Sequence, residues 1–192
     1  TYGAAHVVIA NNVLAHVDDT PDFLEGCKHV LKPDGLIVIE VPYLRDLLDR
    51  LEYDTIYHEH LCYFSVTTLM RLCDRVGLSI RRVEHVPLHG GSLRVYLGRQ
   101  EVQGNHADAV LDYAAAETEA GFENMDRYER FAADVALNRQ AIRRLLEKLK
   151  SDGKVVAGYG APAKGNTLLN YCGIDTQLVS FTVDQNPMKI GH

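Results

Sequence analysis

The part of the sequence richest in groups that transfer protons runs from residue 53 to residue 60 and reads Tyr-Asp-Thr-Ile-Tyr-His-Glu-His. Imidazole, phenol and carboxyl groups exchange protons near neutral pH when burial tunes their pKa values. A metal site is one alternative, because His58 and His60 lie on the same side of an extended segment. No H-E-x-x-H spacing or third ligand accompanies them, so no metal is predicted. A purely structural loop is the other alternative, and we favour proton transfer.

A second polar group follows the first apolar stretch. Residues 7–9 form a short run of β-branched apolar residues, which is typical of a strand buried on both faces. Asn11, Asn12 and His16 come soon after this run. Ligands of open α/β sheets bind at the carboxyl ends of strands. Because Asn12 and His16 are four residues apart, one helical turn would bring both side chains to one face. Capping of a helix is the alternative role for these residues.

A third group lies near the end of the sequence. Gly158, Gly160 and Ala163 fit a loose G-x-G-x-x-G/A pattern between a predicted strand and a predicted helix, and Lys164 follows directly. Glycines let backbone amides approach a pyrophosphate at a helix N-terminus. Asp184 ends the next predicted strand, as the acidic residue of an NAD site does. We favour binding of a nucleotide phosphate, with a bare turn and an NAD site as alternatives.

The segment 89–94, His-Gly-Gly-Ser-Leu-Arg, is the predicted turn of a hairpin. Its glycines suit a turn that needs positive φ angles. The alternative is a loop that approaches a ligand, to which Ser92 would donate a hydrogen bond. The sequence leaves both interpretations open.

Alternating stretches of strand and helix are expected to position these groups. A strand, a helix and a strand at the observed spacing predict a parallel crossover unit, and the two strands around the glycine turn predict an antiparallel hairpin. A long helical stretch follows, and a second strand–helix–strand unit ends the sequence. The predicted strands are 7–9, 36–41, 78–86, 92–99, 154–159 and 178–183, and the predicted helices are 21–31, 45–51, 65–76, 105–150 and one that ends at about residue 171.

Apolar residues recur at spacings of three and four along the long helical stretch. This pattern predicts one helix face that packs against the rest of the chain, with a dimer interface as the alternative. The residues of this stripe are Tyr128, Phe131, Val135, Asn138, Ile142, Leu145 and Leu149.

Bulk properties exclude several classes of protein. The 192 residues suffice for one domain or two small ones, and the net charge of -6 argues against nucleic acid or anionic lipid as a partner. No apolar run approaches the roughly 18 residues of a membrane span, and no signal peptide is apparent. The four cysteines form no C-x-x-C pair. Buried, unpaired cysteines are expected in a cytoplasmic protein.

These segments, in this order, resemble the S-adenosylmethionine-dependent nucleotide-sugar C-methyltransferase family. The Tyr57-His58-Glu59-His60 loop and the Gly-Tyr-Gly-Ala-x-Ala-Lys loop that starts at Gly158 are its most specific matches. The resemblance implies an α/β fold: the second half of a class I methyltransferase sheet with an antiparallel terminal hairpin, then a long helix and a partial Rossmann-like βαβ unit. It implies a methyltransferase portion at residues 1–103 and a helical linker with a sugar-nucleotide-binding domain at residues 104–192. The matching segments also include Asn12-x-x-x-His16, the turn at residues 31–35 and the turn at residues 89–94.

The resemblance also implies a reaction. A base removes the acidic proton next to the ketone of a nucleotide-linked keto-deoxysugar, and the enolate carbon takes the methyl group of S-adenosylmethionine. His60 is the implied base, Glu59 the competing one, and Tyr57 orients or polarises the sugar carbonyl.

The remaining implied contacts concern binding. Ala10 and Asn11 would touch the cofactor. Asn12 and His16 would line the sugar pocket, and Lys164 with the glycine loop would contact the nucleotide phosphates.

The same resemblance implies a zinc module and a glycine-rich cofactor loop at the front of the protein, and neither is present in this sequence. We therefore expect both ends to be cut and the 192 residues alone to be inactive. A monomer or a homodimer is expected. Three alternatives remain: a small-molecule O- or N-methyltransferase, an NAD-dependent oxidoreductase, and a non-catalytic nucleotide-sugar-binding module.

Overall fold

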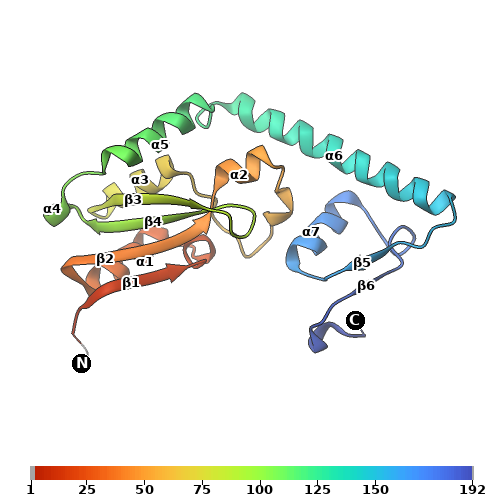
Figure 1. Ribbon diagram of the computed structural model, residues 1–192, viewed down its shortest axis with the longest axis horizontal. Helices are drawn as coiled ribbons and strands as arrows, with labels where there is room; N and C mark the ends of the chain where they lie inside the picture. Colours follow the sequence, from red (N-terminus) through yellow and green to blue (C-terminus); the bar gives the residue numbers. More distant parts are fainter. Residues whose placement is uncertain (1–2, 192) are drawn as a thin grey trace. The chain divides into compact units, whose positions relative to one another are not determined.

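The computed structural model describes residues 3–191 and divides into two compact units (Figure 1). Unit 1 holds residues 3–50 and 59–127, and unit 2 holds residues 51–58 and 128–191. This division differs from the predicted boundary after residue 103 because the helix at 108–119 packs on unit 1. No helix among the described residues is both long enough and apolar enough to cross a membrane.

Unit 1 is built on a four-stranded sheet with the order β1-β2-β4-β3. β1 (Ala5–Asn11) pairs in parallel with β2 (Leu31–Pro42), and α1 (Thr20–Val30) connects them. β3 (Leu78–Val86) and β4 (Ser92–Arg99) form an antiparallel hairpin, in which β4 pairs with β2 (Figure 1). The predicted fold class, a parallel sheet finished by an antiparallel hairpin, is confirmed. The carboxyl ends of β1 and β2 therefore share an edge with the hairpin turn.

One face of this sheet forms the core of unit 1. Ile37, Ile39 and Val41 alternate along β2 and are completely buried. They belong to the same core as residues of α1 and of α3 (Val66–Arg75). Ser65, the first residue of the predicted helix 65–76, caps α3: its hydroxyl accepts from the Thr68 amide, and the Thr68 hydroxyl accepts from the Ser65 amide. This reciprocal capping box fixes where the helix begins.

The opposite face carries charged groups and exposed apolar groups. Glu40 and Arg94 are directly opposite each other on β2 and β4, and Nη2 of Arg94 lies 2.8 Å from Oε2 of Glu40. Val7 and Ile9 of β1 are 51% and 69% exposed. The prediction that β1 is buried on both faces is therefore wrong for the described residues, since only the α1 side of this strand is covered.

The predicted single helical stretch 105–150 is two helices, α5 (Asp108–Glu119) and α6 (Met125–Ser151). Gly121 separates them with a φ angle of 79°, a left-handed conformation that ends helices. The shorter elements of the described residues are η1 (Leu14–His16), α2 (Leu44–Asp49), η2 (Tyr53–Thr55), α4 (Gln100–Gln103) and η3 (Pro187–Lys189).

The predicted apolar stripe on α6 is correct in its middle and wrong near its end. Val135 is buried and Asn138 is half-buried, whereas Leu145 is 58% exposed and Leu146 is buried in its place. Asn138 accepts a hydrogen bond from Tyr53 of η2. This part of the stripe therefore packs within the chain, in line with the favoured prediction, and the dimer interface stays a prediction.

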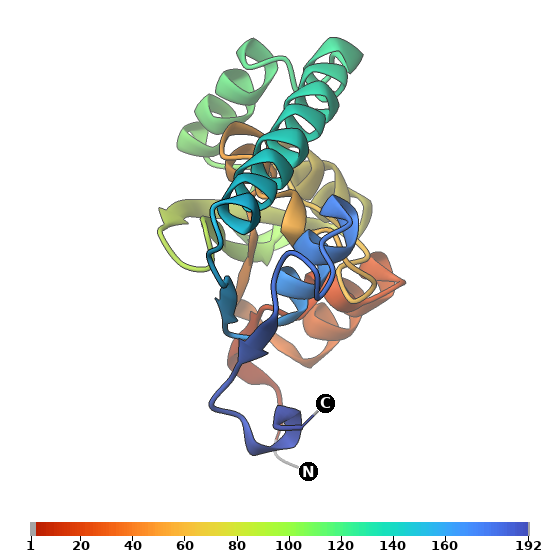
Figure 2. The ribbon, with the colours of Figure 1, turned by 90° about the vertical axis from the view of Figure 1, so that its right-hand side faces the viewer.

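Unit 2 contains the predicted βαβ unit. β5 (Ala157–Tyr159) and β6 (Phe181–Val183) pair in parallel, and α7 (Ala163–Cys172) lies between them in the sequence (Figure 2). Both strands are shorter than predicted. Tyr159 is 84% exposed and Phe181 is 55% exposed, so the described residues give these strands little apolar cover.

Candidate active site

Two imidazole rings predicted from separate motifs meet in unit 1. Nδ1 of His16 lies 2.8 Å from the carbonyl oxygen of Glu59, and the ring centroids of His16 and His60 are 4.9 Å apart. The amide of Leu61 donates to the carbonyl oxygen of Ala15 at 2.8 Å. This bond holds the end of the 53–60 loop against η1. The pair lies just past the end of β1, the edge at which ligands of open α/β sheets bind.

The hydrogen bond to Glu59 fixes the tautomer of His16. A carbonyl oxygen can only accept, so Nδ1 of His16 carries the hydrogen. In the neutral ring Nε2 then keeps its lone pair and can accept a proton. The ring of Tyr63 meets that of His60 edge-on, at 6.2 Å between centroids. The arrangement thus places two imidazoles and a phenol side by side at this edge, groups that can accept or donate protons.

The residues before His16 lie at the carboxyl end of β1. Ala10 is buried in the core, whereas Asn11 is exposed. Asn12 has a φ of 55°, and its amide donates to the carbonyl oxygen of Glu40 at 2.8 Å. The prediction that one helical turn carries Asn12 and His16 is wrong. Only the three-residue 3-10 turn η1 forms here, and Asn12 precedes it in a left-handed conformation that asparagine tolerates.

The 53–60 loop is divided between the two units. Tyr57 and His58 belong to unit 2, where their rings lie 6.3 Å apart, while Glu59 and His60 belong to unit 1. The predicted joint action of Tyr57 and His60 thus stays a prediction. Across residues 3–191, no three or more histidine, cysteine, aspartate or glutamate side chains are grouped so that they could hold a metal ion.

The hairpin turn is built mainly from its own contacts. Ser92 is completely buried, and its hydroxyl donates to the carbonyl oxygen of Leu88 at 3.1 Å. The amide of Gly91 donates to the same oxygen at 2.9 Å. His89 has a φ of 54°, which is uncommon for a residue other than glycine. A hydrogen bond from Ser92 to a ligand would require loss of its bond to Leu88, so its predicted substrate contact has no direct support in this geometry.

An acid–histidine pair beside this turn was not predicted. Oδ2 of the buried Asp46 lies 2.6 Å from Nε2 of His85, and Arg50 pairs with the other carboxylate oxygen at 3.2 Å. Arg50 also donates to the carbonyl oxygen of Gly90. Asp46 lies on α2 and His85 on β3, and no short motif joins them. Only the pairing of the hairpin brings them together.

The cysteines are unpaired. Cys27, Cys73 and Cys172 are buried, as predicted, and Cys62 is half-buried. Burial, with a smaller contribution from Asp74, raises the pKa of Cys73 to about 12. A buried thiol with a raised pKa is a poor nucleophile, so at least this cysteine has a packing role.

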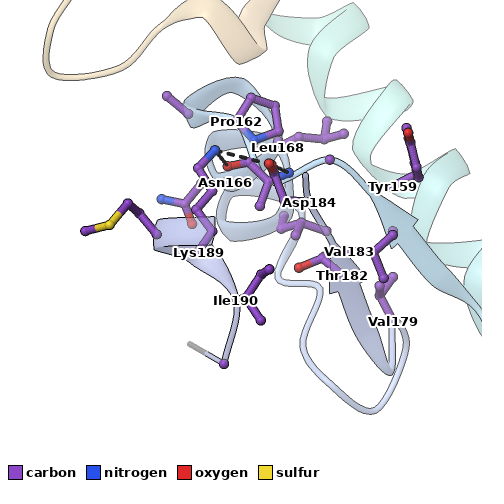
Figure 3. A pocket seen from close by; sticks show the side chains of 18 residues that line it. Tyr159, Pro162, Asn166, Leu168, Val179, Thr182, Val183, Asp184, Lys189 and Ile190 are labelled. Carbon is purple, nitrogen blue, oxygen red and sulfur yellow. Dashed lines mark hydrogen bonds and ion pairs between the residues drawn. The ribbon is translucent and has the colours of Figure 1, made fainter. Parts of the chain in front are cut away.

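Unit 2 contains a cavity of about 790 Å³ next to the glycine-rich loop (Figure 3). Gly158 and Gly160 line it, as predicted for a loop that approaches a ligand. Lys164 lies in the first turn of α7 but is not among the lining residues, whereas Lys189 is. Nζ of Lys189 donates to the carbonyl oxygen of Ala161 at 2.7 Å. The cation that faces this cavity is thus Lys189, which follows the last predicted strand and belongs to no motif.

Asp184 holds the glycine-rich loop in place. Its carboxylate accepts from the amides of Asn186 at 2.9 Å and Ala161 at 2.7 Å, and Nζ of Lys189 lies 3.3 Å away (Figure 3). The amides of Asn186 and then Ala161 lower its pKa to about 2. In an NAD site the acidic residue at this position binds the ribose hydroxyl. Here the carboxylate already binds the loop, which weighs against the NAD alternative.

The glycine at position 158 also has a packing reason. A Cβ there would lie 2.8 Å from Cγ2 of Thr182 on the paired strand. Gly160 has a φ of 91°, so this position too favours glycine for its backbone conformation. The G-x-G spacing therefore reflects both strand pairing and a turn, in addition to any approach of a ligand.

Two known protein families match successive parts of this chain. Residues 2–83 match a methyltransferase domain family. Residues 87–192 match the family described as the C-methyltransferase C-terminal domain. The chain therefore belongs to the C-methyltransferase family.

Individual relatives agree with this assignment. The chain is 38% identical to the C-methyltransferase NovU of Streptomyces niveus over 190 residues, which cover 99% of this chain and 45% of that protein. The chain thus spans a little under half the length of this curated relative.

Among solved structures, the O-methyltransferase NcsB1 in complex with S-adenosylmethionine is 19% identical over 50% of this chain and 29% of its own, with a TM-score of 0.40. The complex of LepI with S-adenosylmethionine is 13% identical over 51% and 27%, with a TM-score of 0.43. These two likenesses are distant, and no residue role is transferred from them.

Proposed function

We propose that the full-length enzyme transfers a methyl group from S-adenosylmethionine to the carbon next to the ketone of a nucleotide-linked keto-deoxysugar. The single observation that carries the proposal is the contact between His16 and His60 at the carboxyl edge of β1. Membership of the C-methyltransferase family supports transfer to carbon. Transfer to the carbon next to a ketone requires a base, because that carbon must first lose a proton to become nucleophilic.

The two imidazoles can supply that base. A proton next to a ketone is acidic because the anion spreads onto the carbonyl oxygen, and a positioned imidazole can remove it. His60 accepts the proton, and His16, whose Nδ1 is held by Glu59, stabilises the charged ring that results. The Glu59 carboxylate is the competing base. Tyr57 polarises the sugar carbonyl by donating its phenol hydrogen.

The edge of the sheet fits a methyl donor. Ala10 is small and buried and Asn11 is exposed at the end of β1, where both would contact the methyl donor, and Asn12 and His16 would line the sugar side. When bound there, S-adenosylmethionine supplies an electrophilic methyl group. The chain's own residues orient the sugar and move its proton.

Proton removal can be tested separately from methyl transfer. The full-length enzyme is mixed with a nucleotide-linked keto sugar and S-adenosylhomocysteine in D₂O, and NMR follows deuterium entry at the carbon next to the ketone. His60→Ala is expected to slow this exchange at least ~100-fold. His29→Ala, an exposed histidine on α1, is the matched control. Exchange by His60→Ala at the wild-type rate would exclude His60 as the base, and Glu59→Gln then tests the competitor.

The cavity of unit 2 is the proposed site for the nucleotide diphosphate. Gly158 and Gly160 line this cavity, where the amide of Gly160 donates to the carbonyl oxygen of Val183, and Lys189, paired with Asp184, places a cation at the cavity wall. Lys164, in the first turn of α7, adds positive charge at the helix N-terminus, which favours anions.

Calorimetry with nucleoside diphosphates tests this site in the full-length enzyme. Lys164→Ala and Lys189→Ala are each expected to weaken binding by about 10-fold, the scale of one charge-assisted contact, and to change turnover at saturating substrate less. Lys148→Ala, exposed on α6, is the control. Unchanged affinity in both variants would remove the diphosphate from this cavity. Tight NAD binding would favour the oxidoreductase alternative.

A further inference from the structure

Tyr53 fastens the first half of the 53–60 loop to the helices of unit 2. Its hydroxyl donates to Oδ1 of Asn138 on α6 at 2.9 Å and lies 3.8 Å from Sγ of Cys172 at the end of α7. Its ring centroid is 5.3 Å from that of Tyr171. Burial, and then Cys172, raise the pKa of Tyr53, so the phenol keeps its hydrogen and donates it. The residue is only 7% exposed.

Backbone hydrogen bonds extend this anchor to Tyr57. The amide of Thr55 donates to the carbonyl oxygen of Glu52, and the amide of Ile56 donates to that of Tyr53. The amide of Tyr57 then donates to the carbonyl oxygen of Thr55 at 3.1 Å. Thr55, Ile56 and Tyr57 are therefore each held by a local backbone bond. A shift of Tyr53 must move the backbone of Tyr57 with it.

The helix α7, which contacts Tyr53 at its Cys172 end, reaches the cavity at its N-terminal end. α7 begins beside the glycine-rich loop, where Gly165 and Asn166 line the cavity, and ends at Cys172. A helix of ten residues spans about 15 Å, so α7 connects the cavity to the contact with Tyr53. Nη1 of Arg143 on α6 donates to the carbonyl oxygen of Cys172 at 2.9 Å, which ties this end to α6 as well.

We propose that Tyr53 is a positioning residue that ties the placement of Tyr57, through α7, to occupancy of the nucleotide cavity. The inference rests on the proposed function, in which Tyr57 donates to the sugar carbonyl and the cavity binds the diphosphate. The chain passes from unit 2 to unit 1 between residues 58 and 59. Tyr57 thus belongs to unit 2, which contains the proposed nucleotide cavity, whereas His60, the proposed base, belongs to unit 1.

Kinetics of the full-length enzyme separate positioning from folding. Tyr53→Phe keeps the ring and removes the hydrogen bond, and Asn138→Ala removes its acceptor. Both are expected to lower kcat at least about 10-fold, because small misplacement of a reacting group is costly, with the KM for the nucleotide sugar little changed. Asn138→Asp keeps an acceptor oxygen and is expected to restore kcat. Gln140→Ala, exposed on α6, is the control.

Two results would overturn the positioning role. One is a lower melting temperature with wild-type kcat in Tyr53→Phe and Asn138→Ala, which would make the bond purely structural. The other is a loss in Asn138→Asp as large as that in Asn138→Ala. The double variant is expected to be no slower than the slower single one, because both changes break the same bond.

Hydrogen exchange tests the coupling without turnover. Saturating diphosphate, chosen from ADP, GDP, CDP, UDP and dTDP by calorimetry, is expected to slow exchange of the amides of residues 55–57 in the wild type but not in Asn138→Ala. Binding without slower exchange in the wild type would overturn the coupling and leave the proposed function intact. Failure of every diphosphate to bind would contradict the proposed nucleotide site itself, and the coupling with it.

Discussion

Glu117 is a buried carboxylate that contacts the start of α3 in unit 1. It lies on α5 and is completely inaccessible to solvent. Oε1 accepts from the hydroxyl of Tyr43 at 3.0 Å and from the amide of Val66 at 2.7 Å. Oε2 accepts from the amide of Thr67 at 2.8 Å and from its hydroxyl at 2.6 Å. The carboxylate thus binds amides of the first turn of α3 that have no partner within the helix, where a negative charge is favourable.

A Glu117→Gln substitution isolates the value of this arrangement. Whichever way the new amide turns, its NH₂ group replaces an oxygen that accepts from a backbone amide, that of Val66 or that of Thr67. One buried N–H then lacks an acceptor, at a cost of about 1–3 kcal/mol. Loss of the negative charge at the helix N-terminus adds about 0.3–1 kcal/mol. We therefore expect the free energy of unfolding to fall by about 1.3–4 kcal/mol, the sum of these two ranges.

Urea unfolding followed by circular dichroism measures this loss. Glu119→Gln, an exposed position two residues further along α5, is the matched control and is expected to change stability by less than about 0.5 kcal/mol. The slope of the unfolding free energy against urea should be unchanged in both variants. Equal midpoints for the two variants would refute the view that this carboxylate holds the start of α3.

Two further predictions concern turns. Gly91→Ala is expected to destabilise the chain by about 1–3 kcal/mol, because Gly91 has a φ of 137° and a Cβ would overlap the Asp46 carboxylate. Gly26→Ala, in α1 with open space around it, is the control and is expected to be neutral or stabilising. Equal thermal midpoints for the two variants would contradict this contrast. The Asp184 carboxyl should titrate near pH 2 by carbon NMR, since its folded pKa lies below its ordinary value of 3.8. Its contribution to stability is then complete above about pH 4 and lost as the pH falls towards 2; a midpoint near 4 would show that the amide of Ala161 is not bound.

The elements that the sequence predicted best are those with local signals. The hairpin strands 78–86 and 92–99 have the predicted bounds, because alternation of apolar residues and a glycine turn define them at short range. The start of α3 was predicted from Ser65 for the same reason. The break at Gly121 was missed because the helical pattern on both sides of it outweighed one glycine.

Contacts between distant segments could not be predicted in this way. Asp46 and His85 are 39 residues apart, and Glu117 and Val66 are 51 apart. Neither pair has a fixed spacing that a motif could record, because register and helix packing bring them together. Lys189 was missed for a related reason, since its role depends on the turn that follows β6 and on Asp184.

The 53–60 loop shows how a compact motif can mislead about where its groups are held. Eight consecutive residues suggest one rigid site, yet Tyr53 is fastened to α6 and α7, while Glu59 and Leu61 are fastened to His16 and Ala15. Each half of the loop therefore takes its position from a different core. In the proposed function, the carbonyl donor Tyr57 and the base His60 are therefore carried by different units. If so, substitutions at the two anchors should differ in effect: loss of the Tyr53 bond should impair use of the carbonyl donor, whereas loss of the His16 bond should slow proton exchange directly.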